Sequence, residues 1–277
     1  MASVEAHQKA NAMRRDIIEM ISCAGSGHPG GSLSCTDILS ALYFGGVMTY
    51  DPTDPTLDSR DRFILCKGHA APALYAVLAE AGFFPKEELK TLRKLGTRLQ
   101  GHPDSTLLPG VEVSTGSLGQ GLSIAAGLAA GLRLKDNPAK VYALLGDGEC
   151  QEGQVWEAAN FAAAQNLGNL VAIVDANGLQ IDGALEDVCS AGSLSDKFAA
   201  FGWEVHEADG HDIDGLIPLF TSLENAPFGT PQVIIAKTVK GKGVSFMENQ
   251  AGWHGKAPDE EQTRQALAEL ESEASHD

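Results

Sequence analysis

The sequence predicts an α/β fold of three layers, α/β/α, in which helices cover both faces of a mostly parallel sheet. First, short apolar runs of strand length alternate with segments of helical periodicity. Second, these runs are continuously apolar, which is typical of parallel strands buried on both faces. Third, 277 residues are enough for one large core. Because no internal repeat or linker divides the chain, residues 1–277 are predicted to form a single domain.

The first half of the chain is predicted mainly helical. Residues 4–23 place apolar side chains on one stripe, so we expect an amphipathic helix that ends at the glycine loop 25–27. A second helix is expected to begin near Ser34 or Thr36, both of which are N-cap residue types. The other elements predicted here are a strand at 62–66, helices at 70–82 and 85–95, and a long loop at 101–118. A loop of that length in a compact domain is usually functional.

From residue 119 onward, helices and strands alternate regularly. The predicted strands are 141–145, 170–174, 203–206 and 233–238. The predicted helices are 119–134, 155–165, 196–201 and 213–223. An acidic helical tail is expected at 259–277, with an apolar stripe of Leu267, Leu270 and Ala274. Since ligands of parallel sheets bind at the carboxyl ends of the strands, residues that follow strands are the first candidates for a site.

Charge and cysteine content exclude several classes of function. Twenty basic and 37 acidic side chains give a net charge of −17, which would repel nucleic-acid phosphates and anionic lipid. The longest apolar stretch, 122–134, is shorter than the ~20 residues that span a bilayer. We therefore expect neither a nucleic-acid partner nor a membrane partner. Five widely spaced cysteines without a C-x-x-C pair favour reduced thiols and a cytoplasmic location.

Two loops that follow neighbouring strands carry oxygen ligands. Gly146-Asp147-Gly148 follows one predicted strand, and Asn177 follows the next. The Asp147 carboxylate, the Asn177 amide oxygen and the backbone carbonyl near Leu179 suit Mg²⁺ when a phosphate and water complete its shell. The two glycines would let backbone N–H groups approach a diphosphate. Gly-Asp-Gly alone is more often a plain turn, but its position after a strand favours a metal site.

Histidines provide the second signal of a functional site. Four of them lie in glycine-flanked loops, namely His28, His69, His102 and His254. An imidazole can donate to a phosphate or a hydroxyl and can move a proton near neutral pH. One such histidine would more often be structural, whereas four in glycine-rich loops favour a site. The remaining histidines lack this context and are expected to be structural or exposed: His7, His206, His211 and His276.

These blocks resemble the transketolase family. The segment from Gly146 to Asn177 resembles the family's thiamine-diphosphate motif. Further matching blocks are SGHPGG at 26–31, KGHA at 67–70, GHPD at 101–104, PGVEVSTGSLGQG at 109–121, QEG at 151–153 and WHGK at 253–256. The resemblance covers about residues 10–258 and corresponds to the family's amino-terminal, diphosphate-binding domain. It implies a thiamine-diphosphate-binding fold whose cofactors are thiamine diphosphate and Mg²⁺, with Ca²⁺ or Mn²⁺ as alternatives.

The resemblance also implies roles for single residues. His28 and His254 would handle the hydroxyl proton when the donor carbon–carbon bond breaks, and His102 would hold the hydroxyl beside the donor carbonyl. The residues implied to bind thiamine diphosphate are His69, Gly116, Leu118, Gly146, Gly148, Asn177, Lys240 and His254. The metal ligands would be Asp147, Asn177 and Leu179. A solvated loop lysine is an equally good reading of Lys240. Glu152 and Glu157 match acidic positions at the family's subunit interface, although two ordinary surface glutamates remain plausible.

The implied activity is transfer of a two-carbon ketol unit from a ketose phosphate to an aldose phosphate. The glutamate that the family uses to activate the cofactor belongs to a second domain, which this chain lacks. The chain therefore resembles the amino-terminal subunit of a split transketolase, whose partner in an α2β2 assembly is a C-terminal, pyrimidine-binding subunit. Apolar surface around Leu118, Val155 and Trp156 is expected to be exposed for this partner. The alternatives are a related thiamine-diphosphate enzyme acting on an unusual sugar and a non-catalytic scaffold.

Overall fold

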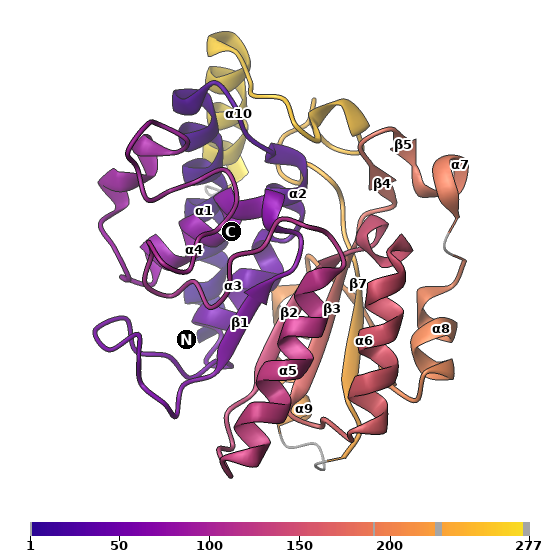
Figure 1. The fold of residues 1–277 in the computed structure, drawn as a ribbon. Helices are drawn as coiled ribbons and strands as arrows, with labels where there is room; N and C mark the ends of the chain where they lie inside the picture. Colours follow the sequence, from indigo (N-terminus) through magenta and orange to yellow (C-terminus); the bar gives the residue numbers. More distant parts are fainter. Residues whose placement is uncertain (1, 191, 225–228, 274–277) are drawn as a thin grey trace.

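A single parallel sheet organises the chain. The computed structural model describes residues 2–190, 192–224 and 229–273. Five strands pair in the order β1-β2-β3-β7-β6, and every pairing between them is parallel (Figure 1). Their bounds are β1 Arg62–Leu65, β2 Val141–Gly146, β3 Leu170–Ala176, β6 Glu204–Asp209 and β7 Gln232–Lys237. Each strand contains or overlaps a run that the sequence analysis predicted.

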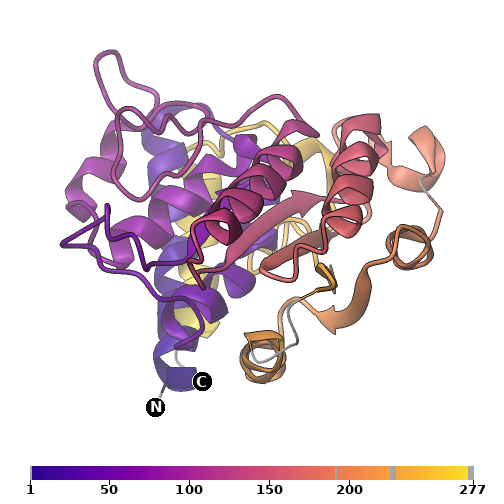
Figure 2. The same ribbon diagram turned by 60° about the horizontal axis from the view of Figure 1, so that its bottom comes forward.

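Helices cover both faces of the sheet, as Figures 1 and 2 show from two directions. One face carries α1 (Ala2–Ala24), α3 (Thr36–Phe44), α4 (Ala71–Glu80), α9 (Ile213–Glu224) and α10 (Glu260–Glu273). The other face carries α5 (Gln120–Leu134), α6 (Gly153–Ala164) and α8 (Leu194–Ala200). The predicted three-layer α/β/α architecture is therefore confirmed.

Short elements lie between these layers. They are α2 (Pro29–Ser34), α7 (Leu185–Cys189), a small hairpin of β4 (Leu179–Gln180) and β5 (Gly183–Ala184), and 3-10 turns at Gly68–Ala70, Lys86–Thr91, Gly148–Gln151 and Ala251–Trp253. The long segment expected to be a loop, 101–118, contains no helix or strand. No helix among the described residues is long and apolar enough to cross a bilayer.

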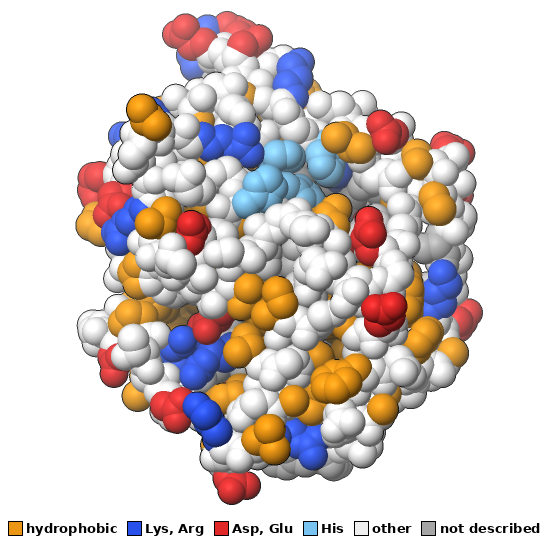
Figure 3. All heavy atoms as spheres, viewed as in Figure 1, with side chains coloured by type: hydrophobic (Ala, Val, Ile, Leu, Met, Phe, Trp, Pro, Cys, Tyr) orange, Lys and Arg blue, Asp and Glu red, His pale blue; other side chains and the backbone are white. Residues whose placement is uncertain are grey.

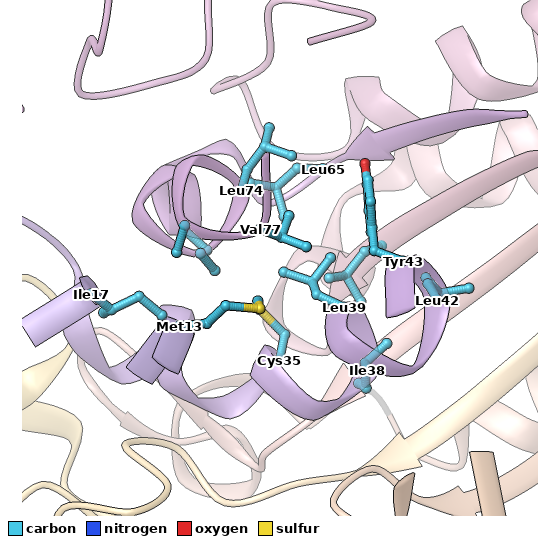
Figure 4. Close-up of a cluster of buried hydrophobic side chains, with 14 of the residues drawn as sticks. Met13, Ile17, Cys35, Ile38, Leu39, Leu42, Tyr43, Leu65, Leu74 and Val77 are labelled. Carbon is cyan, nitrogen blue, oxygen red and sulfur yellow. The ribbon is translucent and has the colours of Figure 1, made fainter. Parts of the chain in front are cut away.

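The sheet divides the apolar side chains into two cores. Successive residues of a strand point to opposite faces, so Tyr142 and Leu144 of β2 join one core while Ala143 and Leu145 join the other. Figure 4 shows part of the first core, where residues of α1, α3, α4 and β1 meet: Met13, Ile17, Ile38, Leu39, Leu42, Tyr43, Leu65, Leu74 and Val77. Because both faces of each inner strand are buried, the strands read as continuous apolar runs.

Two predicted elements need correction. The helix expected at 85–95 is a short 3-10 helix, Lys86–Thr91, and the chain then takes a left-handed conformation at Arg93, with φ of 58°. Leu89 and Leu92 are both buried, and their spacing of three residues suits a 3-10 turn as well as an α-helix. The block at 26–31, read as a loop, opens the helix α2, whose first position is a proline.

The acidic tail forms α10 and packs on α1. Ala266 and Leu270 are buried in the first core, and Leu267 packs against it. Asn11 of α1 also donates a hydrogen bond to the Leu270 carbonyl at 3.0 Å. Ala274, expected to continue the apolar stripe, lies outside the described residues.

The register of the strands brings their carboxyl ends to one level. Gly146 of β2 lies beside Asp175 of β3, which in turn lies beside Ala236 of β7. The loops that leave these strands therefore begin side by side. This edge of the sheet is where the candidate residues of the sequence analysis converge.

The close approach of α5 to β1 gives a test of the packing. A Cβ added at Gly121 would lie 2.6 Å from both Cβ and Sγ of Cys66, whereas one added at Gly127, on the same helix, meets nothing within 4 Å. We expect Gly121→Ala to destabilise the fold by about 1–3 kcal/mol, because overpacking strains a close-packed core. Gly127→Ala should instead stabilise it by about 0.5–1 kcal/mol. Thermal unfolding measures both, and a shift of the same sign in the two variants would contradict this packing.

Candidate functional site

The four histidines in glycine-rich loops come together at the carboxyl edge of the sheet. Their ring centroids are 4.9 Å apart for His69 and His254, 5.3 Å for His28 and His69, 5.5 Å for His28 and His254, and 6.5 Å for His28 and His102. Figure 3 shows histidine side chains as one pale-blue patch on this face. We call these four residues the histidine cluster. His276 lies outside the described residues.

The cluster consists of neutral imidazoles at physiological pH. Burial, followed by the positive charge of Arg93, lowers the pKa of His28 to about 4. Burial, followed by Lys240, lowers the pKa of His254 to about 4. The pKa values of His69 and His102 are also lowered, again chiefly by burial. Each ring therefore holds one proton and can offer one donor and one acceptor.

A buried ion pair lies next to the histidine cluster at the carboxyl edge of the sheet. Lys67 follows β1, and Asp175 is the second-last residue of β3. Their side chains are 2% and 0% exposed and pair directly. Lys67 also donates to the Gly31 carbonyl at 2.7 Å, and the Ser34 hydroxyl donates to Asp175 at 2.5 Å. The Thr238 hydroxyl donates to the second carboxylate oxygen. Burial alone would raise the pKa of Asp175, but Lys67 and these donors lower it, so the pair stays ionised.

Asp147 lies beside this pair, in the loop after β2. Its carboxylate is buried and accepts N–H groups from Gly148 at 2.8 Å and from Gly178 at 2.6 Å. Burial raises the pKa of Asp147 to about 6, and the nearby Asp175 adds to the increase. The two backbone donors are too few to replace the lost hydration of the carboxylate. A cation at this position would stabilise its charged form.

The other two predicted metal ligands follow β3: Asn177 lies in the loop and Leu179 begins β4. The Asn177 side-chain oxygen accepts the Leu179 N–H at 3.1 Å, and the Leu179 carbonyl accepts from Lys240 Nζ at 3.1 Å. In the described part of the chain, no three His, Cys, Asp or Glu side chains converge on a point that could hold a metal. The predicted set has only one carboxylate, with an amide and a carbonyl. Such a set fits a hard cation that takes further oxygens from a bound phosphate.

Lys240 connects the metal-ligand loops to the histidine cluster. Its side chain is 2% exposed, and Nζ lies 3.1 Å from Nδ1 of His254 as well as against the Leu179 carbonyl. Burial, followed by repulsion from Lys67, lowers the pKa of Lys240 to about 8. The alternative reading of a solvated loop lysine is therefore wrong, because the loop after β7 folds this side chain into the site.

The long loop 101–118 forms one wall. A Cβ added at Gly116 would lie 3.0 Å from the His102 ring, so the glycine lets this ring pack against the backbone. An open pocket of about 510 Å³ is lined here by His102, Ser114, Thr115, Gly116, Ser117, Gln120 and Ile124. Leu118 is 36% exposed, so the expected exposure of this apolar side chain is confirmed. The expectation for Val155 is wrong: it is fully buried in the second core, because it lies on the sheet-facing side of α6.

Several polar residues of the site were missed from the sequence. Lys67 lies in the KGHA block and Glu149 in the segment 146–177, but a sequence motif does not indicate which of its residues are buried. Glu149 accepts the N–H groups of Gly119 at 2.9 Å and Gly146 at 3.1 Å, and burial raises its pKa to about 7. Arg93 carried no signal, since the segment around it was predicted to be a regular helix. Its guanidinium reaches the histidine cluster at His28.

The remaining predicted residues are placed as follows. Glu152 and Glu157 are both exposed, on the face that carries α6. His211, expected to be structural, has Nδ1 2.7 Å from the Asp37 carboxylate and accepts the Val239 N–H at 2.8 Å. It therefore ties α3 to the segment that leads into Lys240.

Known proteins with this sequence pattern are transketolases. Residues 5–275 match the family model described as transketolase, thiamine diphosphate binding domain. The chain is 43% identical to the 6-deoxy-6-sulfo-D-fructose transketolase subunit of Clostridium sp. (strain MSTE9), with 98% of both chains covered. It is 43% identical to an apulose-4-phosphate transketolase subunit of Actinobacillus succinogenes, with 97% of both covered.

Longer transketolases match over part of their length. The Homo sapiens transketolase is 42% identical over 95% of this chain and 42% of its own length. The crystal structure of the Campylobacter jejuni transketolase superposes with a TM-score of 0.90 at 33% identity, covering 97% of this chain and 43% of that one. The chain therefore belongs to the transketolase family, in which it corresponds to the thiamine diphosphate-binding domain.

Proposed function

We propose that this chain is the amino-terminal subunit of a split transketolase. With a C-terminal subunit, it would transfer a two-carbon ketol unit from a ketose phosphate to an aldose phosphate. The observation that carries the proposal is the histidine cluster, which Lys240 connects to the buried Asp147: Lys240 Nζ lies 3.1 Å from Nδ1 of His254, and its charge acts on the Asp147 carboxylate. Relatives of nearly the same length are named transketolase subunits, which supports a working unit of this size, residues 1–277.

The chain offers a matching set of groups for the cofactor. Thiamine diphosphate supplies the stabilisation of a carbanion when it is bound. The cofactor ligands would be His69, Gly116, Leu118, Gly146, Gly148, Asn177, Lys240 and His254. The Asp147 carboxylate, the Asn177 side-chain oxygen and the Leu179 carbonyl would hold Mg²⁺, with Ca²⁺ or Mn²⁺ as alternatives. The buried, poorly solvated carboxylate of Asp147 supports this assignment, because a divalent cation would restore its charged state.

His28, His102 and His254 would act on the sugar. As neutral rings, they can hold the hydroxyl groups of the donor by hydrogen bonds and handle the proton of the breaking bond. His102 lies at the pocket wall formed by Gly116, where the donor carbonyl would enter. The rings of His28, His69 and His254 are half-buried and His102 is exposed, so the proposed partner subunit would have to exclude water from them. Exclusion of water would favour transfer of the ketol unit to a sugar over loss to solvent.

A partner subunit would complete the site. The pocket beside His102 is open on one side, and Leu118 at its edge is exposed. We propose that a C-terminal subunit with the pyrimidine-binding half covers this side in an α2β2 assembly, in which Glu152 and Glu157 would face a neighbouring subunit. The five cysteines are all free, which fits a reducing, cytoplasmic compartment.

A second candidate function is a ketol transfer that involves an unusual sugar. It is favoured by the names of two relatives, which specify a sulfonated deoxyfructose and apulose phosphate. The two candidates share the cofactor site and differ only in substrate. The buried charges around Asp147 disfavour a non-catalytic scaffold. Apolar residues could pack this region equally well, so packing alone does not account for the charges.

The metal assignment is tested by removing its side-chain ligands. We expect Asp147→Asn and Asn177→Ala to weaken thiamine diphosphate binding at least ~10-fold, because Mg²⁺ dehydrates reluctantly and tolerates few lost oxygen ligands. Asp182→Asn, an exposed aspartate in the β4–β5 hairpin, is the matched control and should bind normally. Calorimetric titration of the reconstituted complex decides it. Unchanged affinity in both site variants would defeat the assignment.

The histidines are expected to divide the work. His102→Ala should leave cofactor affinity intact and lower kcat/KM about tenfold, since its proposed partner is a substrate hydroxyl and one hydrogen bond is worth about 1 kcal/mol. His69→Ala should weaken both cofactor binding and turnover, because this ring is proposed to contact the diphosphate. Titration and steady-state rates of the reconstituted enzyme measure the two effects. Equal losses of cofactor affinity would show that this division is wrong.

The need for a partner is tested with the chain alone. We expect no aldose formation from thiamine diphosphate, Mg²⁺, a ketose phosphate and this chain, because the proposed partner would supply the other half of the cofactor pocket. Adding a C-terminal subunit that carries the pyrimidine-domain glutamate should restore turnover. Full activity without a partner would overturn the split-enzyme proposal, and the activating carboxylate would then have to lie within these residues.

A further inference from the structure

Arg93 has a backbone conformation that is unusual for its residue type. Among the described residues, four other than glycine have positive φ: Arg93, Asp136, Asn166 and Asn249. Asp and Asn tolerate this region, whereas for an arginine it costs about 1–2 kcal/mol. The Arg93 N–H donates to the Leu99 carbonyl at 2.9 Å, which closes the turn. A strained residue that persists in this way points to a use for its side chain.

The guanidinium of Arg93 is aimed at one ring of the histidine cluster. Nη1 donates to the Ser26 hydroxyl at 2.8 Å, and Nη2 lies 3.2 Å from Nδ1 of His28. The backbone leaves room for it at Gly101, where an added Cβ would lie 3.1 Å from Nε and 3.2 Å from Cζ. The turn, the serine and the glycine therefore fix the guanidinium against the ring.

This contact determines which nitrogen of His28 carries the proton. A guanidinium has only donors, so a hydrogen bond between the two groups requires a lone pair on Nδ1. In a neutral ring the proton then lies on Nε2. A Cβ added at Gly255 would lie 3.5 Å from both Cδ2 and Nε2 of His28, so the protonated nitrogen faces the loop that carries His254.

We propose that Arg93 is a positioning residue that keeps Nδ1 of His28 unprotonated, so that His28 serves the site as a neutral hydrogen-bond donor through Nε2. This inference rests on the proposed ketol transfer and refines it. His28 would donate its Nε2–H to an oxygen of the sugar. A group other than His28 would then accept the hydroxyl proton of the ketose donor. A proton could reach Nδ1 only by displacing the guanidinium.

The charges around His28 agree with this assignment. The groups that face the ring are Arg93, Lys240 and the other rings of the cluster, His69, His102 and His254. Burial and the cationic neighbours all lower the pKa of His28, to about 4. The ring is therefore neutral at physiological pH, and its tautomer decides what it can do.

Nitrogen-15 NMR of the full chain, labelled at histidine, tests the proposal without substrate or partner. His28→Gln identifies the His28 resonances. We expect wild-type His28 to have an unprotonated Nδ1 and a protonated Nε2 at neutral pH. In Arg93→Gly, which keeps the left-handed backbone at no steric cost, the titration midpoint of His28 should rise by about one pH unit, a tenfold gain in proton affinity.

Two further variants separate a positioning role from a structural one. Arg98→Gly removes a guanidinium of the same segment that pairs with Glu88 instead, and should leave the His28 titration unchanged. Arg93→Lys keeps the charge without the planar fork and should restore most of the low midpoint. In the reconstituted complex, Arg93→Gly should lower kcat about tenfold with unchanged thiamine diphosphate affinity, the loss expected for one misplaced hydrogen bond.

A protonated Nδ1 in the wild-type neutral ring, or a His28 midpoint that does not move in Arg93→Gly, would overturn the proposal. These readouts do not depend on the reaction. A complex that shows no ketol transfer while the His28 titration behaves as expected would contradict the proposed function and leave the Arg93 assignment standing.

Discussion

The buried pair of Lys67 and Asp175 holds the parts of the site together. It joins the end of β1 to the end of β3, and through Ser34 and Thr238 it also ties α2 and the segment after β7 to the same point. Removing one partner of such a pair costs about 3–5 kcal/mol, because the other charge is left buried alone. The loops that carry the histidine cluster and the metal ligands lie around these four segments, so the pair fixes their relative positions.

The site has an electrostatic character opposite to that of the whole chain. The chain carries a net charge of −17, yet Lys67, Lys240 and Arg93 surround four imidazoles at the edge of the sheet. Burial and these cations keep the rings neutral. A neutral ring beside a fixed cation offers a donor to an anion or a hydroxyl without adding charge of its own. The local excess of positive charge suits an anionic ligand.

The pattern of apolar residues along the sequence predicted the helix and sheet layers well, because that pattern is set by which residues are buried. Strands such as Val141–Gly146 and Leu170–Ala176 are buried on both faces, so every residue in them is apolar until the carboxyl end is reached. The same reasoning failed at 85–95, where the spacing of Leu89 and Leu92 fits two kinds of helix and the chain forms a 3-10 turn followed by a left-handed residue at Arg93. It also failed at Val155, because the apolar face of α6 cannot be distinguished from a partner-facing surface by composition.

Residue types at fixed spacing along the chain were enough to predict the α/β class, the family and the four loop histidines. Which charges are buried together, and which ring nitrogen meets which neighbour, became known only from the folded structure. Lys67 and Asp175 are 108 positions apart, and Arg93 and His28 are 65 apart. Contacts over such separations leave no periodic trace, because they are set by how the sheet and its loops pack and not by any local preference of the backbone.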